Sequence, residues 1–323
     1  MTAETGAGLP PRTGGDTGPE RSELAPAKIN WALEVLGRRE DGYHELITVL
    51  ETVSLFDELR FEPADRLEVV VEGPEVAALA HVGGDSLVRR AAAALADEAG
   101  AAARGRVRIS KRIPVGAGLG GGSSDAAAAV RLLTRCWELP LDPARDRRAA
   151  ERCGSDVPFF LRGGLQLAEG RGERLTPLPP WPAPRWLVLA APAAPPVERK
   201  TARVFAALRP EEWTRGDAVR GWLADRRRPP FNGLLAGALR VFPLLAHQLE
   251  RIGFATGRAV CLSGAGPSVF VPLDGPEDAP AVLRACADVG LRAWLVSAVA
   301  GTSDRRMNAD AGGEKGPRRV DEG

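Results

Sequence analysis

Apolar and polar residues alternate along several segments of the chain, and this period of two predicts β-strands. The clearest segment is 27–36, where Ile29, Trp31, Leu33 and Val35 share one face, because successive strand residues point to opposite sides. Similar segments predict strands over 46–61, 67–72, 106–113, 186–191 and 292–299, paired strands over 157–169, and two strands around a loop over 259–272. Strands therefore make up much of the predicted fold.

Helices are predicted between these strands. An Ala-rich run over 87–99 predicts a helix that Asp85 or Ser86 begins and Gly100 ends. Further helices are predicted over 143–152, 199–208, 213–225, 233–252 and 278–289. Because strands and helices are mixed without a strict βαβ rhythm, the pattern predicts the α+β fold class.

Composition along the chain predicts where the folded part begins, divides and ends. Residues 1–24 are rich in Gly, Pro and Thr, which predicts a disordered leader. Residues 301–323 are highly charged and predict a second disordered tail. The segment Pro177–Pro184 holds five prolines in eight residues, which excludes a helix or central strand. We therefore expect an N-terminal lobe over 25–177 and a C-terminal lobe over 178–300.

Charge and cysteine usage exclude several classes of protein. The 323 residues carry 43 Lys and Arg against 42 Asp and Glu, which disfavours nucleic-acid binding by phosphate neutralisation. No stretch approaches 18 uninterrupted apolar residues, so no membrane-spanning helix is predicted. Four scattered cysteines predict reduced thiols in a reducing compartment, and with a composition rich in Arg and Ala we expect a bacterial cytoplasmic location. Only four basic residues are lysines, which makes each a candidate for a special role: Lys28, Lys111, Lys200 and Lys315.

The strongest candidate for chemistry is the sequence PVGAGLGGGSS at 114–124. Glycines let backbone N–H groups converge on an anion, and Ser123 or Ser124 is expected to begin a helix that runs to about 138. Three interpretations are open: a plain glycine-rich connection with serine capping, a dinucleotide-binding GxGxxG loop, and a phosphate-binding loop of another kind. A Walker A loop is excluded, because no GKS or GKT follows.

Two polar residues on the first strand and one acidic residue are candidates for catalysis. Lys28 and Asn30 share one face of that strand, in the sequence PAKIN. Lys28 is either a solvated strand residue or a buried functional amine. Asp156, in GSDVPFF, is either a helix or turn cap or a buried catalytic base.

Two further segments each have a structural and a functional interpretation. Tyr43 and His44 lie together in DGYHE, either in an incidental turn or as groups that stack on a ring and bond its edge. The loop Ser263–Ser268 is either a plain hairpin or a second wall of the phosphate site.

Taken in order, these motifs resemble those of the GHMP kinases, the superfamily of galactokinase, homoserine kinase, mevalonate kinase and phosphomevalonate kinase. PVGAGLGGGSSDAA resembles its central phosphate motif and LSGAGPSVF its last glycine motif. The resemblance implies a lobe like ribosomal protein S5, a ferredoxin-like lobe, and ATP-dependent phosphorylation of an alcohol. PAKIN and GRREDGYHEL further imply that the alcohol is 4-diphosphocytidyl-2-C-methyl-D-erythritol, phosphorylated at its C2 hydroxyl for isoprenoid precursor synthesis.

The resemblance also implies roles for residues of this chain. It implies that Lys28 and Asp156 form the catalytic pair. It implies that Asn30, Tyr43 and His44 contact the substrate, with Tyr43 stacked on the cytosine ring. No nucleic-acid or membrane partner is implied.

For the nucleotide, the resemblance implies an ATP phosphate loop made of Pro114, Val115, Gly116, Ala117, Gly118, Leu119, Gly120, Gly121, Gly122, Ser123 and Ser124. It places Lys111 near the adenine and Thr201 beside the substrate. Mg²⁺ is expected with the triphosphate, with Ser123 or Ser124 as its candidate protein ligand. Ser86 and Ala265 depart from residues common in the family, an Asn and a Ser or Thr, which puts two contacts in doubt.

Two rival classes of function stay open. One is another enzyme of the same fold, such as a homoserine or mevalonate kinase or a diphosphomevalonate decarboxylase. The other is a ligand sensor derived from a kinase, which binds ATP without turnover.

Overall fold

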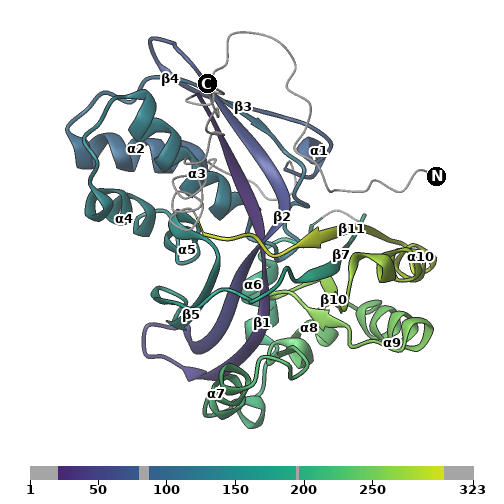
Figure 1. The fold of residues 1–323 in the computed structure, drawn as a ribbon. Coiled ribbons are helices and arrows are strands. Elements are labelled where there is room, and N and C mark those ends of the chain that lie inside the picture. The colour runs from purple at the N-terminus through teal and green to yellow at the C-terminus, as the bar shows by residue number, and fades with distance from the viewer. Residues whose placement is uncertain (1–20, 80–86, 194–195, 302–323) are drawn as a thin grey trace, which may run out of the picture.

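The computed structural model describes residues 21–79, 87–193 and 196–301. Its first sheet has seven strands in the order β3-β4-β2-β1-β8, with β5 and β6 attached through β2. Two long antiparallel strands form its centre (Figure 1). The strands are β1 (Ser22–Arg38), β2 (His44–Glu62), β3 (Leu67–Glu72), β4 (Gly105–Ser110), β5 (Leu165–Gly170), β6 (Arg174–Pro177) and β8 (Phe231–Asn232).

Four helices cover one face of this sheet, to the left in Figure 1. They are α2 (Leu87–Ala99), α3 (Gly121–Cys136), α4 (Pro143–Glu151) and α5 (Val157–Arg162). The Ala126–Ala129 run of α3 is fully buried, because small side chains let this helix lie close to the strands. A short helix α1 (Val76–Leu79) follows β3.

The second sheet has four strands in the order β11-β7-β10-β9 and lies to the right in Figure 1, with α9 (Leu245–Thr256) and α10 (Ala279–Asp288) beside it, whereas α7 (Asp217–Ala224) packs against β1 and β2. Its strands are β7 (Trp186–Pro192), β9 (Cys261–Leu262), β10 (Val269–Leu273) and β11 (Leu291–Ser297). The other helices of this half are α6 (Lys200–Ala206) and α8 (Leu235–Val241). Short 3₁₀ turns lie at Pro210–Glu212 and Pro276–Asp278.

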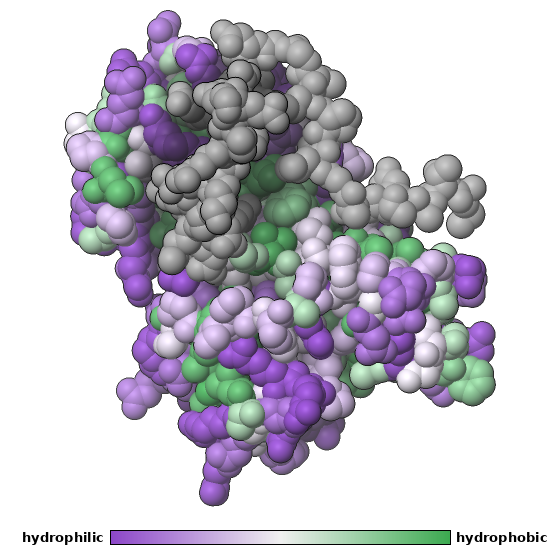
Figure 2. Space-filling model, in the orientation of Figure 1, coloured by the Kyte–Doolittle hydropathy of each residue, from purple (hydrophilic) through white to green (hydrophobic). Residues whose placement is uncertain are grey.

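The two sheets share a hydrophobic core, so the proline-rich segment does not separate them cleanly. β8 comes from beyond that segment, yet it pairs in parallel with Ala32 and Leu33 of β1. Trp181, within the segment, lies 5.5 Å from the ring of Trp31, and Trp222 of α7 stacks on Trp31 from 6.2 Å. Figure 2 shows hydrophobic residues gathered between the two halves of the visible face.

Two predicted elements are wrong. Residues 157–162 form helix α5 instead of a strand, because Pro158 favours the first turn of a helix. The helix predicted over 233–252 is two helices, α8 and α9, separated at Phe242–Leu244. Pro243 causes this break, because it lacks the backbone N–H that a continuous helix needs.

Three predicted boundaries also differ. β1 already begins at Ser22, inside the predicted leader, and β4 ends at Ser110. α3 begins at Gly121, with Gly120 at its N-cap and no side-chain capping bond, so the predicted serine cap is wrong. The predicted cap at Asp85 or Ser86, and the tails over 1–20 and 302–323, lie outside the described residues.

None of the helices in the described part of the chain has both the length and the apolar character needed to cross a bilayer.

Candidate active site

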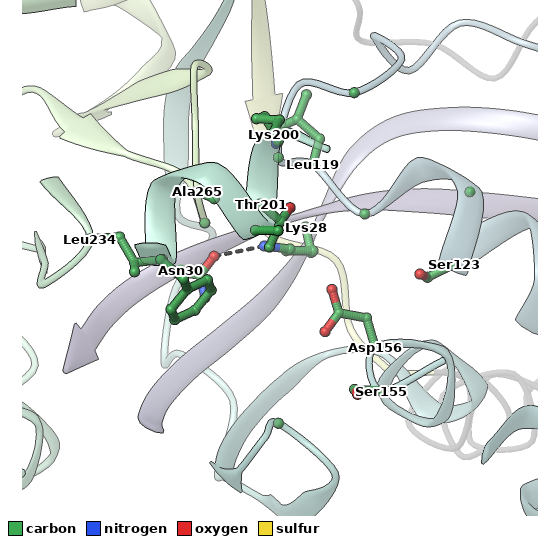
Figure 3. Close-up of a pocket in the computed structure, with 18 of the residues that line it drawn as sticks. Lys28, Asn30, Leu119, Ser123, Ser155, Asp156, Lys200, Thr201, Leu234 and Ala265 are labelled. Carbon is green, nitrogen blue, oxygen red and sulfur yellow. Dashed lines mark hydrogen bonds between the residues drawn. The ribbon is translucent and has the colours of Figure 1, made fainter. Parts of the chain in front are cut away.

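One cavity of about 1530 Å³ gathers the predicted site residues. Pockets for one small ligand measure about 300–1,000 Å³, so this one has room for two. It is lined by Lys28, Asn30, Tyr43, His44, Lys111, the loop Pro114–Ser123, Asp156 and Thr201 (Figure 3). Ser124 is the one predicted residue that does not line it: its side chain is buried inside α3.

The glycine-rich loop runs between β1 and the second glycine loop. Its backbone accepts a hydrogen bond from Lys28 N at Leu119 O (3.0 Å) and another from Ser268 N at Ala117 O (3.1 Å). Gly118 has a φ of 89°, and a Cβ there would lie 2.6 Å from the carbonyl oxygen of Ser263. The loop therefore needs glycine to pack this closely, and its N–H groups are set at the N-terminus of α3, where an anion is favoured.

The second glycine loop is both a hairpin and a wall of the cavity. It joins the antiparallel strands β9 and β10, and its Gly264 and Ala265 line the cavity. Asn232 of β8 donates to the carbonyl oxygens of Leu262 and Gly264 (2.9 and 2.8 Å). The first sheet thus fixes the position of the second wall. Asn232 was not a predicted site residue, and it is one of only three asparagines in the sequence.

Lys28 and Asp156 both lie in the cavity, and the amine of Lys28 is turned toward Asn30 (Figure 3). Lys28 is buried, and its Nζ donates to Asn30 Oδ1 at 2.7 Å, while Asn30 Nδ2 donates to Thr48 Oγ1 at 2.9 Å. Burial lowers the pKa of Lys28, and the charge of Asp156 opposes that shift. This chain of bonds holds the amine at one place.

Asp156 stands directly before α5, but its side chain makes no capping hydrogen bond. Of the two interpretations open for this residue, the cap is therefore wrong. Its carboxylate is turned toward the cavity, where it is exposed and available to accept a proton.

Aromatic side chains line one end of the cavity. The ring of His44 stacks on Phe205 of α6 at 4.9 Å and meets Trp213 edge-on at 6.5 Å. Tyr43 is 54% exposed, and the guanidinium of Arg171 lies 4.8 Å from its ring centre. Burial, followed by the charge of Arg38, lowers the pKa of His44 and favours the neutral imidazole. This end can therefore stack on a flat ring and bond its edge.

The opposite end of the cavity is apolar. It is lined by Val71, Leu79, Leu87, Val88 and Ile109, from β3, α1, α2 and β4. The sequence pattern placed Val71, Leu87, Val88 and Ile109 only in strands and helices, and it placed Leu79 in no element. Phe205 and Trp213 were missed as well, although Phe205 stands one helical turn after Thr201, a spacing that places both on one face of α6.

Lys111 is engaged in a buried ionic cluster beneath the glycine-rich loop. Its Nζ lies 2.5 Å from Asp57 Oδ2 and 2.5 Å from Asp125 Oδ2, and it is only 4% exposed. Asp57 also accepts from the backbone of Arg112 and Ile113 (2.6 and 2.9 Å). The amine that the resemblance places near the adenine is thus paired with two carboxylates, and this pairing joins β2, the end of β4 and α3 below the loop.

The cavity offers oxygen atoms to a magnesium ion. Of the two serines considered as ligands, Ser123 lines the cavity, whereas Ser124 Oγ is buried without a hydrogen-bond partner among the described residues. No group of three His, Cys, Asp or Glu suited to a metal occurs in that part of the chain. Mg²⁺ bound with a nucleotide takes most of its ligands from phosphates and water, so a site of this kind needs few protein oxygens.

Comparison with known proteins shows the class first. Residues 86–164 match the family model of the GHMP kinases N terminal domain. The crystal structure of a mevalonate kinase from L. major shares the fold, with a TM-score of 0.63 at 15% identity over 89% of this chain and 97% of that one. The fold is therefore that of a GHMP kinase, and the expected two-lobed α+β architecture is confirmed.

Closer relatives show the family. The 4-diphosphocytidyl-2-C-methyl-D-erythritol kinase of Pelotomaculum thermopropionicum is 40% identical over 76% of this chain and 87% of its own length. That of Thermus thermophilus is 39% identical over 84% and 92%. A crystal structure of 4-(cytidine 5'-diphospho)-2C-methyl-D-erythritol kinase superposes with a TM-score of 0.70 at 37% identity, over 87% and 100%. The chain belongs to the 4-diphosphocytidyl-2-C-methyl-D-erythritol kinase family.

Proposed function

We propose that the protein transfers the γ-phosphoryl group of ATP to the C2 hydroxyl of 4-diphosphocytidyl-2-C-methyl-D-erythritol. The observation that carries this proposal is the single cavity with an apolar end, an aromatic end and the Lys28–Asp156 pair between them. Two substrates bound at the two ends would meet at this pair. The products are ADP and the 2-phosphate of the acceptor.

In the transfer step, the acceptor oxygen forms a bond to the γ-phosphorus while the bond from that phosphorus to the β,γ-bridging oxygen breaks. Asp156 accepts the hydroxyl proton, a contribution of roughly 10²–10⁴ in rate for a general base. Lys28 is placed beside Asp156 and the acceptor hydroxyl, and its charge offsets the negative charge that spreads over the phosphoryl oxygens. Asn30 accepts a hydrogen bond from the amine of Lys28 and so fixes its position.

The nucleotide is placed at the apolar end, with its phosphates on the loop Pro114–Ser123. Backbone N–H groups and the N-terminus of α3 bind the phosphates, so no side-chain cation is required from the loop itself. Mg²⁺ would neutralise phosphate charge there, with Ser123 as the candidate protein oxygen within the cavity. The apolar side chains of β3, α2 and β4 cover the base.

The acceptor is placed at the aromatic end. Tyr43 and Phe205 offer ring faces to the cytosine, and the neutral His44 offers an N–H and a lone pair to its edge. Thr201 lines the path from this end to the catalytic pair. We place the reaction in the bacterial cytoplasm, since Cys153, Cys261 and Cys286 are buried thiols outside any disulfide.

The test is release of ADP from Mg²⁺–ATP with three acceptors in parallel: 4-diphosphocytidyl-2-C-methyl-D-erythritol, homoserine and mevalonate. Turnover with the cytidine compound alone supports the proposal. Turnover with another acceptor would retain the catalytic pair and overturn the substrate. Binding of ATP without any turnover would instead indicate a ligand sensor.

A further inference from the structure

Lys200 is a buried lysine in the cavity that neither the motifs nor the proposed mechanism has used. It is the first residue of α6, it is 8% exposed, and it lines the cavity beside Thr201 (Figure 3). Arg199, directly before it, has φ 48° and ψ 29°, a left-handed conformation that residues with a Cβ seldom adopt. The backbone is therefore strained at the turn that presents Lys200 to the site.

The hydrogen bonds of Lys200 are incomplete. Within the described residues its Nζ has one acceptor, the carbonyl oxygen of Gly266 in the second glycine loop. An ammonium group has three N–H donors, so two of them have no acceptor among the residues that the structure describes. A buried donor without a partner is costly, which indicates that a ligand with several acceptor oxygens completes this site.

The charges around Lys200 indicate that this ligand is an anion. Burial lowers the pKa of Lys200 to about 7, the charge of Lys28 lowers it further, and Asp156 opposes both effects. Two buried amines thus face one carboxylate, and a group with more than one negative charge would balance them. A phosphoryl group in transfer between ATP and an alcohol at the Lys28–Asp156 pair has this charge.

A purely structural role fits Lys200 poorly. A neutral donor such as an amide could tie α6 to Gly266 without burying a charge beside Lys28. Most cations of this chain are arginines, yet Lys28, Lys111 and Lys200, the lysines within the described residues, all line this one cavity. A compact ammonium suits a single phosphoryl oxygen better than a forked guanidinium.

We propose that Lys200 is a further catalytic residue, which contacts the transferring phosphoryl group together with Lys28. In this role it binds the γ-phosphate of ATP and stabilises the charge that spreads over its oxygens during transfer. The inference rests on the proposed function, because it takes the reacting group to be a phosphoryl group.

The first experiment compares Lys200→Ala with Arg203→Ala in steady-state turnover. Arg203 is an exposed cation on the same helix that does not line the cavity, so its removal controls for lost charge and for helix stability. We expect Lys200→Ala to lower kcat by about 10²-fold or more, with less than about a threefold change in the KM of the cytidine acceptor. Arg203→Ala should stay within about twofold of the natural protein.

Added ethylammonium keeps this test specific. It can enter the space left by the lysine side chain and should restore part of kcat in Lys200→Ala, while the same concentration should leave kcat of the unaltered protein and of Arg203→Ala unchanged. A loss of activity that ethylammonium does not relieve, together with a lowered unfolding temperature, would assign Lys200 to structure and overturn the proposal.

A second experiment uses the unaltered protein as well and does not depend on the variant's activity. Above pH 7 a lysine with this lowered pKa is largely neutral, so binding of Mg²⁺–ATP at pH 8 should draw about one proton from solution. Titration calorimetry in two buffers of different ionisation enthalpy measures this uptake. We expect uptake in the natural protein, much less with Mg²⁺–ADP, and its loss in Lys200→Ala.

Equal proton uptake in the natural protein and Lys200→Ala would overturn the assignment. Both readouts are separable from the proposed function. If the natural protein phosphorylates none of the three acceptors but still takes up the proton with ATP, the substrate is wrong and the phosphate contact of Lys200 stands.

Discussion

At the scale of single residues, the proposed chemistry depends on a carboxylate and an amine that differ in burial. Lys28 is enclosed and held by Asn30, whereas Asp156 is exposed to the cavity. The enclosed amine keeps its position without substrate, and the open carboxylate can reach a hydroxyl group when one binds. Changes to these two residues should therefore affect the chemical step more than substrate binding.

We expect Asp156→Asn to lower kcat by about 10²-fold or more, because the amide cannot accept the hydroxyl proton. The KM of both substrates should change little. The measurement is steady-state turnover, with Asp97→Asn, a surface carboxylate paired with Arg152, as the matched control. An active Asp156→Asn enzyme would remove this residue from the reaction.

We expect Tyr43→Ala and Phe205→Ala to raise the KM of the cytidine acceptor about tenfold or more and leave the KM of ATP nearly unchanged. Loss of a stacked ring removes roughly 1–3 kcal/mol per base. Separate titrations of the two substrates give both values. A similar rise in both would indicate a damaged fold rather than a lost ring contact.

The protonation of the buried residue Glu51 affects the stability of the folded protein. It is buried between Trp31 and Trp181, whose indole N–H groups donate to it at 2.5 and 2.9 Å. Burial raises its pKa to about 7, against the effect of the two indoles and of the charges on Arg185 and Arg226. The folded protein therefore holds a proton here that the unfolded chain releases at a lower pH.

This raised pKa sets the sign of the pH dependence. Its contribution to stability is present below about pH 4.5 and is lost as pH rises through about 7. Between pH 5 and pH 8 we expect a loss of about 2 kcal/mol from this group. Glu51→Gln, which cannot ionise, should flatten that dependence in urea unfolding. An unchanged slope would mean that Glu51 is not the group responsible.

At the scale of elements, sequence patterns predicted most strands and helices. They failed at two prolines, one that begins a helix and one that ends a helix. Pro158 begins α5 where paired strands were predicted, and Pro243 divides one predicted helix into two. The apolar run VPFF fits either a buried strand or a short helix, so its pattern alone could not decide. Pro158 in the first turn, together with packing against α3 and α4, makes it a helix.

The site residues that lie within a sequence motif could be predicted. Lys28, Asp156, Tyr43, His44 and the glycine-rich loop all line the cavity. Other residues reach the cavity only through the packing of elements that are far apart in the sequence, and these could not be predicted. The apolar end and Trp213 join the cavity through tertiary contacts. The partners of Lys111 could not be read from the sequence either, since Asp57 is 54 residues away.

The loop and the ionic cluster beneath it act as one element. We expect Lys111→Met to destabilise the protein by about 3–5 kcal/mol, because it leaves two buried carboxylates without a counter-charge. The pKa of Asp125 is already raised to about 7 by burial. Thermal and urea unfolding measure the loss.

The double variant Lys111→Met with Asp125→Asn serves as the control. It removes one of the two orphaned charges and should recover part of the stability. If Lys111→Met weakened only ATP binding and left stability unchanged, the lysine would be a nucleotide contact, as the resemblance implies, rather than a support.

At the scale of the whole molecule, the site lies where two sheets are joined into one body. β1 carries Lys28 and Asn30 toward the cavity and Trp31 toward the core that both sheets share. Cavity residues from beyond the proline-rich segment, among them Lys200, Phe205 and Gly264, come from elements of the second half. The first half holds the apolar end together with Tyr43 and His44, and Phe205 and Trp213 of the second half complete the aromatic end.

The pairing of β1 with β8 has a consequence for how the protein is made. One edge of the catalytic strand is completed by Phe231 and Asn232, so it stays open on the ribosome until that part of the chain emerges. An open strand edge invites pairing with other chains. Nascent chains that stall before Phe231 should therefore need a chaperone to remain unaggregated, and the enzyme becomes active only late in its own synthesis.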